Sequence, residues 1–164
     1  KIVKNALKIK PNYICIVPEN RKEITTEGGL NLDKNQKKLK NIIQIFKQAK
    51  IRTSLFVNPT IRDIKLSKDL NTDCVEIHTG RLSNLVKSKK NYYTELNRIK
   101  KSSLLAKKLN IEVHAGHGLD YQTTKILSKI NEIQEFNIGH FIIGESIFFG
   151  LSKVIRNFKK ILKK

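Results

Sequence analysis

Apolar strand-like runs alternate with amphipathic helical stretches along the chain. Five short segments have the length and composition of β-strands: 13–17, 51–57, 74–78, 111–115 and 134–138. Apolar residues between and after them recur at helical spacing, in stretches that include 1–9, 93–109, 121–130, 141–149 and 151–162. The pattern therefore predicts strands and helices that follow one another in regular alternation.

The first strand, 13–17, is a continuous apolar run, which is typical of a strand buried on both faces. Cys15 and Cys74 lie in such apolar runs and are expected to be buried, reduced thiols. Asp33 has the side chain of a helix N-cap and is expected to start the next helix. The polar residues from Thr79 onward predict a loop before the following helix.

Strands that alternate with helices are joined by right-handed crossovers, which produces a parallel sheet. An open doubly wound sheet and a (β/α)8 barrel both begin in this way, and two features favour the barrel. Glycine-rich turns after the last two strands lead to helix N-termini, where such barrels commonly hold phosphate. Polar side chains also fall on one face of their strands, as a barrel interior near a site permits: Glu76, His78, Glu112, His114 and Asn137.

We therefore expect an α/β protein of one domain, residues 1–164, that forms part of a TIM (β/α)8 barrel. Five βα units do not close a barrel, so the last five units are taken as present and the first three as missing. The sequence contains no Met and opens at Lys1 in what reads as a helix, which places the missing units upstream. Because two strand edges stay unpaired, the chain alone is expected to be inactive and poorly soluble.

A net charge of +19 raises the alternative of a basic nucleic-acid-binding domain. The lysines are spread over most predicted helices, and Tyr and Phe are not interleaved with them as stacking partners. No apolar run approaches a membrane span and no signal peptide opens the chain. We therefore expect a cytoplasmic protein without a nucleic-acid or membrane partner, and keep nucleic-acid binding as the alternative.

His117 is the clearest candidate for chemistry, because it stands between two glycines where the strand 111–115 ends. An imidazole titrates near neutral pH and suits proton transfer. Gly139 and His140 open the last helical region, where free N–H groups and the helix dipole favour an anion. Gly118 offers another close backbone approach, so these residues predict a phosphate cradle beside the imidazole.

Glu76 lies two residues before His78, so both side chains point to the same side of their strand. The pair is either a structural ion pair or a site in which the carboxylate stabilises a cationic intermediate. Thr25 lies in a loop that ends in Gly28 and Gly29, which suits a ligand-contacting segment. No metal cluster, Walker loop or dinucleotide fingerprint is present in the sequence, and neither a cofactor nor a metal is expected.

Five motifs together carry a resemblance to a known family. In order along the chain they read VPENRKEITTEGGL (17–30), SLFV (54–57), VEIHTG (75–80), HAGHGLDY (114–121) and FNIGHFIIGESIFFGL (136–151). At these spacings the chain closely resembles the pyridoxine 5′-phosphate synthases, transferase-class barrel enzymes of vitamin B6 biosynthesis. The resemblance implies condensation of 3-amino-2-oxopropyl phosphate with 1-deoxy-D-xylulose 5-phosphate to pyridoxine 5′-phosphate, phosphate and water.

The resemblance also implies a role for each matched residue. His117 would be the proton donor and Glu76 the transition-state stabiliser. Thr25 would contact 1-deoxy-D-xylulose 5-phosphate. The 3-amino-2-oxopropyl phosphate would be held by Gly118, Gly139 and His140. The family further suggests a homo-oligomer, an octamer, while its general-base histidine and glutamate would lie on the three missing units.

Another phosphate-binding barrel enzyme, an isomerase or aldolase, is the nearest alternative. Such an enzyme would usually show a Schiff-base lysine at an inward strand position, and we find none.

Overall fold

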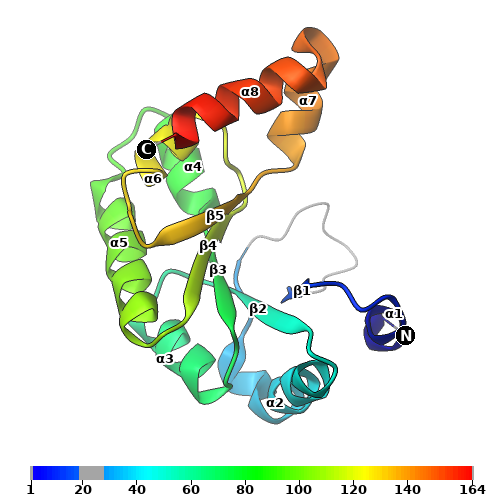
Figure 1. Cartoon of the computed structure of the whole chain (residues 1–164). Coiled ribbons are helices and arrows are strands. Elements are labelled where there is room, and N and C mark those ends of the chain that lie inside the picture. The colour runs from blue at the N-terminus through cyan, green and yellow to red at the C-terminus, as the bar shows by residue number, and fades with distance from the viewer. Residues whose placement is uncertain (1, 19–27, 164) are drawn as a thin grey trace.

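Five parallel strands form one sheet, and they lie side by side in the order in which they occur in the chain (Figure 1). The computed structural model describes residues 2–18 and 28–163. Within these residues the strands are β1 (Tyr13–Ile16), β2 (Arg52–Val57), β3 (Cys74–His78), β4 (Glu112–Gly116) and β5 (Ile133–Asn137). All four neighbouring pairs are parallel, as the alternating pattern predicts.

Helices precede, connect and follow these strands. In chain order they are α1 (Ile2–Ile9), α2 (Leu32–Gln48), α3 (Ile61–Asp69), α4 (Gly80–Lys87), α5 (Tyr93–Lys108), α6 (Tyr121–Leu127), α7 (His140–Phe149) and α8 (Leu151–Leu162). Helices α2, α3 and α5 lie along the same, outer side of the sheet (Figure 1). No helix of the described residues has both the length and the apolarity needed to cross a membrane.

The strand order separates the two architectures that the sequence left open. In a doubly wound sheet the order reverses at a switch point, and helices cover both faces. Here the order β1-β2-β3-β4-β5 never reverses, because each right-handed crossover adds its strand on the same side as the last. The α/β fold is therefore that of a partial barrel, as expected.

The two faces of the sheet differ in polarity. The outward side chains of Leu55, Val75 and Val113 lie next to one another across β2, β3 and β4 and are fully buried beneath the helices. The intervening positions place Glu76 beside His114 on the opposite face. The expected alternation of apolar and polar residues is thus present, and the polar face is the inner face of the partial barrel.

Strand β1 differs from its prediction because it lies at the edge of the described sheet and pairs only with β2. Tyr13 and Cys15 are exposed, so the expectation that 13–17 is buried on both faces is wrong, as is the burial of Cys15. Cys74 lies on a central strand and is buried as expected, and both cysteines are free. The apolar run identified a strand but not its place in the sheet.

Two helix predictions also need correction. The N-cap of α2 is Asn31, whose side chain accepts a hydrogen bond from the Lys34 N–H, and Asp33 lies in the first turn. Helix α4 forms where a polar loop was expected. Its buried face combines Leu82 and Val86 with the small polar Ser83, which conceals the helical pattern.

The C-terminal helices leave an apolar surface uncovered. Four large side chains of α7 are exposed, and Leu151 at the start of α8 is exposed as well: Ile143, Ile147, Phe148 and Phe149. Helix α8 instead buries Val154 and Phe158, and Phe158 packs against Tyr121 of α6. The outer side of α7 is therefore available for contact with another surface.

Candidate active site

One pocket of about 670 Å³ opens at the carboxyl ends of β3, β4 and β5. Five of the six residues singled out in the sequence line it: Glu76, His117, Gly118, Gly139 and His140. The sixth, Thr25, lies outside the described residues. Neighbouring parallel strands end at the same edge of the sheet, so residues up to 64 positions apart in sequence reach one cavity.

Glu76 projects from β3 and is oriented by a residue of β5. The Asn137 side-chain amide donates a 2.8 Å hydrogen bond to Glu76 Oε2, and the Cys15 thiol donates a longer one of 3.5 Å to the same oxygen. Burial raises the pKa of Glu76, and the hydrogen bonds from Asn137 and Cys15 offset part of that rise. The carboxylate is therefore held in place by neutral donors and not by a formal ion pair with His78.

Gly116 gives the carboxylate its space. A Cβ atom at this position would overlap Glu76 Oε1 and would lie 2.8 Å from Glu76 Cδ and 3.2 Å from Asn137 Cβ. Only glycine therefore permits the observed position of Glu76 beside β4.

His117 has an unusual backbone conformation for a residue with a side chain. Its φ angle is +80°, in the left-handed region, and Gly118 follows with a φ of +75°. The imidazole ring lies 4.8 Å from that of His78 and 6.4 Å from the ring of Phe56, measured between centroids. Burial, followed by the charges of His140 and Lys87, lowers the pKa of His117, so its imidazole is predominantly neutral at pH 7.

The opposite wall of the pocket has the character of an anion site. Helix α7 begins at His140, and its N-cap is Gly139. A Cβ atom on Gly139 would have no neighbour within 4 Å, so the space beside this residue is open. There is no acidic residue in the first turn of α7, and the pocket is lined by Lys87 as well as by Glu145, which lies further along the helix. The free N–H groups of the helix start and the Lys87 side chain favour a bound phosphate.

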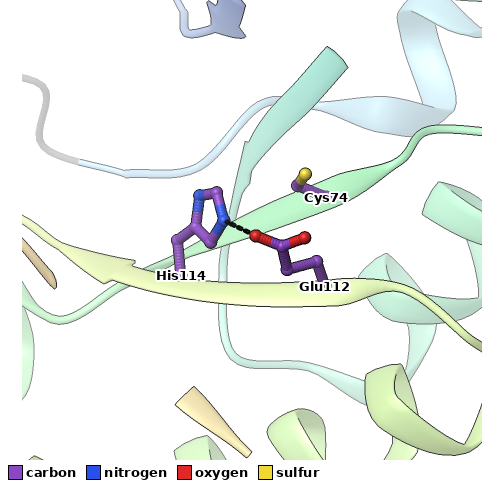
Figure 2. A group of neighbouring side chains, drawn as sticks. All are labelled: Cys74, Glu112 and His114. Carbon is purple, nitrogen blue, oxygen red and sulfur yellow. Dashed lines mark hydrogen bonds and ion pairs between the residues drawn. The ribbon is translucent and has the colours of Figure 1, made fainter. Parts of the chain in front are cut away.

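A separate polar group lies near the amino ends of β3 and β4. Figure 2 shows Cys74, Glu112 and His114, whose candidate ligand atoms all lie within 4.8 Å of one another. His114 Nε2 is 2.9 Å from Glu112 Oε1. Among the described residues this is the one group with the composition of a metal site.

The position of Arg52 argues against a metal at this group. Its guanidinium binds Glu112 Oε2 and lies 3.4 Å from Cys74 Sγ, so a cation already occupies the space between these ligands. Burial raises the pKa of the Cys74 thiol to about 12, whereas a metal needs the thiolate. We therefore interpret the group as an ion network and assign it no metal.

Sequence reasoning gave no role to three residues that the structure places at the site. Asn137 orients Glu76, while Phe56 and Lys87 line the pocket. The sequence identifies Asn137 only as a polar strand residue. The sequence gives no signal for Lys87, because its pattern predicts a loop where the structure has helix α4.

Fold and pocket together define a class of protein. It is a barrel-type α/β protein in which titratable side chains and a helix N-terminus meet at the carboxyl ends of parallel strands. The family described as "Pyridoxal phosphate biosynthesis protein PdxJ" matches residues 1–164, and the chain belongs to this family.

Individual relatives agree with this assignment. The chain is 63% identical over 164 residues to pyridoxine 5′-phosphate synthase of Pelagibacter ubique (strain HTCC1062), with 100% of the chain and 69% of the relative covered. The enzyme of the same name from Zymomonas mobilis is 45% identical, with 96% and 60% covered. That of Prochlorococcus marinus (strain MIT 9312) is 41% identical, with 96% and 65% covered. The chain thus spans about two thirds of the length of these relatives.

Proposed function

We propose that this chain supplies the C-terminal five βα units of a pyridoxine 5′-phosphate synthase. The enzyme would condense 3-amino-2-oxopropyl phosphate with 1-deoxy-D-xylulose 5-phosphate to pyridoxine 5′-phosphate, phosphate and water. The observation that carries the proposal is that one pocket gathers His117, Glu76 and the glycine-rich anion cradle. Family membership supports the same reaction over a nucleic-acid-binding domain.

In this proposal His117 relays protons. Condensation of an amine with a ketone, enolisation and loss of water each require proton transfer, which a positioned imidazole accelerates. Because its pKa is lowered, the ring is neutral at pH 7 and has to take up a proton before it donates one to the departing hydroxyl. Its place in the lining of the pocket, together with Glu76 and His140, suits this exchange.

Glu76 would stabilise the positive charge that develops when the amine condenses. Its position is fixed by the 2.8 Å bond from Asn137, so little reorganisation is needed as charge develops. Gly118, Gly139 and His140 would hold the phosphate of 3-amino-2-oxopropyl phosphate, and we add Lys87 as a further cationic contact. Thr25 is proposed, from the family likeness alone, to contact 1-deoxy-D-xylulose 5-phosphate.

The proposal is tested by H117N in the full-length protein, with product formation measured from both substrates. We expect kcat to fall by about 10²- to 10⁴-fold, the usual contribution of a general acid or base. H114N is the matched control, because His114 is a buried histidine of β4, the strand that leads to His117, and it belongs to the ion network. We expect H114N to lower stability but to keep kcat within a few-fold, and full activity of H117N would refute the role of His117.

Assembly and cellular location are further parts of the proposal. We infer a cytoplasmic homo-oligomer, an octamer by the family likeness, that needs no cofactor or metal. The exposed apolar side of α7 supports contact with another subunit. Light scattering of the full-length protein tests the oligomer, and F148E, which charges a side chain that is 81% exposed, should shift it toward smaller species.

A further inference from the structure

We propose that the turn His78–Thr79–Gly80 at the end of β3 positions His117. Thr79 would fix the backbone, Gly80 would give the ring its space, and His78 would pack against the ring. The inference rests on the proposed function, because it assigns the residues that hold the proton donor of that reaction.

The need for positioning comes from the backbone of His117. Its φ of +80° is a conformation that residues with a side chain rarely adopt, at a cost of about 1–3 kcal/mol. The surrounding structure has to offset that cost, or the loop would relax and carry the imidazole away from the pocket. The end of β3 and the residues that follow it contact this loop and supply the compensating interactions.

Thr79 makes the first of these contacts. Its buried hydroxyl lies 2.8 Å from the carbonyl oxygens of both Gly116 and His117. The Thr79 backbone N–H already donates to the Gly116 carbonyl at 2.9 Å, so the hydroxyl proton is available to the His117 carbonyl. A hydroxyl at this place fixes the peptide group that follows His117.

Gly80 contributes in a second way, because it has no side chain. A Cβ atom on Gly80 would lie 2.6 Å from His117 Cδ2 and 2.9 Å from His78 Nε2. Both distances are shorter than real Cβ contacts, so the two imidazoles can lie this close to the backbone only because residue 80 has no side chain. Any larger residue here would push the His117 ring out of its position.

His78 makes the third contact through its ring. The ring is 8% exposed, lies 4.8 Å from that of His117 at an angle of 37°, and meets the edge of Phe56 at 5.3 Å. Within the described residues and without solvent, its buried Nε2 has no hydrogen-bond partner. The ring therefore serves as a packing surface for His117, which also faces the titratable groups Lys87 and His140 on other elements.

The test compares T79V, T79S and T72V in the full-length protein. T79V removes the hydroxyl at nearly constant volume, and T79S retains it. T72V is the matched control, because the buried Thr72 hydroxyl likewise lies within hydrogen-bond distance of two backbone carbonyl oxygens, those of Thr53 and Cys74, at the other end of β3. Each variant is assayed for kcat, KM and the pH dependence of kcat/KM, with the melting temperature recorded alongside.

We expect T79V to lose at least tenfold in kcat with KM changed less than threefold, because a small displacement of a catalytic group has a large effect on rate. The pH profile should move with it, and T79S should restore both. T72V should lower the melting temperature while kcat and the pH profile stay as in the wild type. If T79V behaves like T72V in an active protein, the positioning role is overturned.

A second variant decides the matter if T79V does not fold. H78N opens space beside the His117 ring, so water enters and the ring titrates at higher pH in NMR spectra of ¹³C-labelled histidine, assigned with H117N. We expect kcat to fall in parallel, and unchanged titration and kcat would overturn the inference. A wild-type protein that forms no pyridoxine 5′-phosphate would instead count against the proposed function and leave the altered titration of His117 as a separate result.

Discussion

Gly116→Ala is the most informative single substitution in this protein, because it adds one methyl group at the point where β4 meets Glu76. The new Cβ would overlap Glu76 Oε1 and lie 2.8 Å from Cδ, whereas ordinary contact begins at 3.4 Å. The backbone of β4 is held by its pairing to β3 and β5, so the carboxylate has to move. Movement breaks the hydrogen bond from Asn137.

The size of the effect follows from two opposing contributions. Loss of a hydrogen bond to a partly buried carboxylate costs about 1.5–3 kcal/mol. Replacement of glycine by alanine within a strand returns roughly 0.5–1 kcal/mol. The net loss of about 1–2 kcal/mol lowers the melting temperature by roughly 2–8 °C for a chain of this size. Activity should fall by about 10- to 100-fold, because the displaced carboxylate no longer faces the substrate.

A double-mutant cycle with E76A isolates the contact. In E76A the obstructing oxygen is absent, so G116A should be neutral or slightly stabilising, which gives a coupling energy of about 2 kcal/mol between the two positions. G144A is the steric control, because a Cβ at Gly144 meets nothing within 4 Å. Urea unfolding gives the free energies. Additive effects of G116A and E76A would refute the reasoning, as would undiminished activity of G116A.

The remaining predictions concern the proposed phosphate cradle, the buried imidazole of His78 and the ion network of Arg52 and Glu112. The new Cβ in G139A would meet no atom within 4 Å, so the melting temperature should equal that of the wild type. The methyl group would, however, stand in the proposed phosphate cradle, so KM for 3-amino-2-oxopropyl phosphate should rise about tenfold or more; an unchanged KM would contradict phosphate binding at this position. Burial, and then the charge of His117, lowers the pKa of His78 to about 4. Below pH 6.5 the imidazole of His78 is therefore protonated in the unfolded chain but not in the folded protein. The free energy of unfolding should decrease as the pH is lowered from about 6.5 to about 4, and the decrease should be smaller in H78N. Zinc should leave the melting temperature of the wild type unchanged, because the Arg52 guanidinium lies beside Cys74 and Glu112 and burial raises the pKa of the Cys74 thiol; stabilisation by zinc would contradict the interpretation of this group as an ion network.

The sequence was sufficient to predict the sheet and the gathering of the pocket. Both depend on short-range patterns: apolar strands alternate with helices, and glycines follow the strand ends. Parallel topology brings these strand ends to one edge of the sheet, so their residues form one cluster. Strand β3 was predicted with its observed bounds, 74–78, because it is central and its alternation is complete. The meeting of His117 and His140 in one pocket follows from the same rule.

Features that depend on long-range contacts could not be predicted. An apolar run looks the same in a central strand and at an edge, so the exposure of Cys15 in β1 depends on neighbours and not on sequence. Asn137 and Glu76 are 61 residues apart, and no local pattern links an amide on one strand to a carboxylate on another. Asn31 and Asp33 are both good N-caps, and the helix begins after the first because Leu32 is buried in its first turn.

Two carboxylates on the inner face of the sheet show how environment separates structural from chemical roles. Although burial acts to raise the pKa of Glu112, the hydrogen bonds from His114 and Arg52 outweigh it and lower that pKa. Burial raises the pKa of Glu76, whose hydrogen-bond donors are the uncharged Asn137 and Cys15. The charge of a carboxylate that is paired with a cation is already neutralised and stabilises the fold. The charge of a carboxylate held by neutral donors is not neutralised, so it can interact with a cation of the substrate. This contrast, on neighbouring strands of one sheet, is the physical reason to propose Glu76 and not Glu112 for the chemistry.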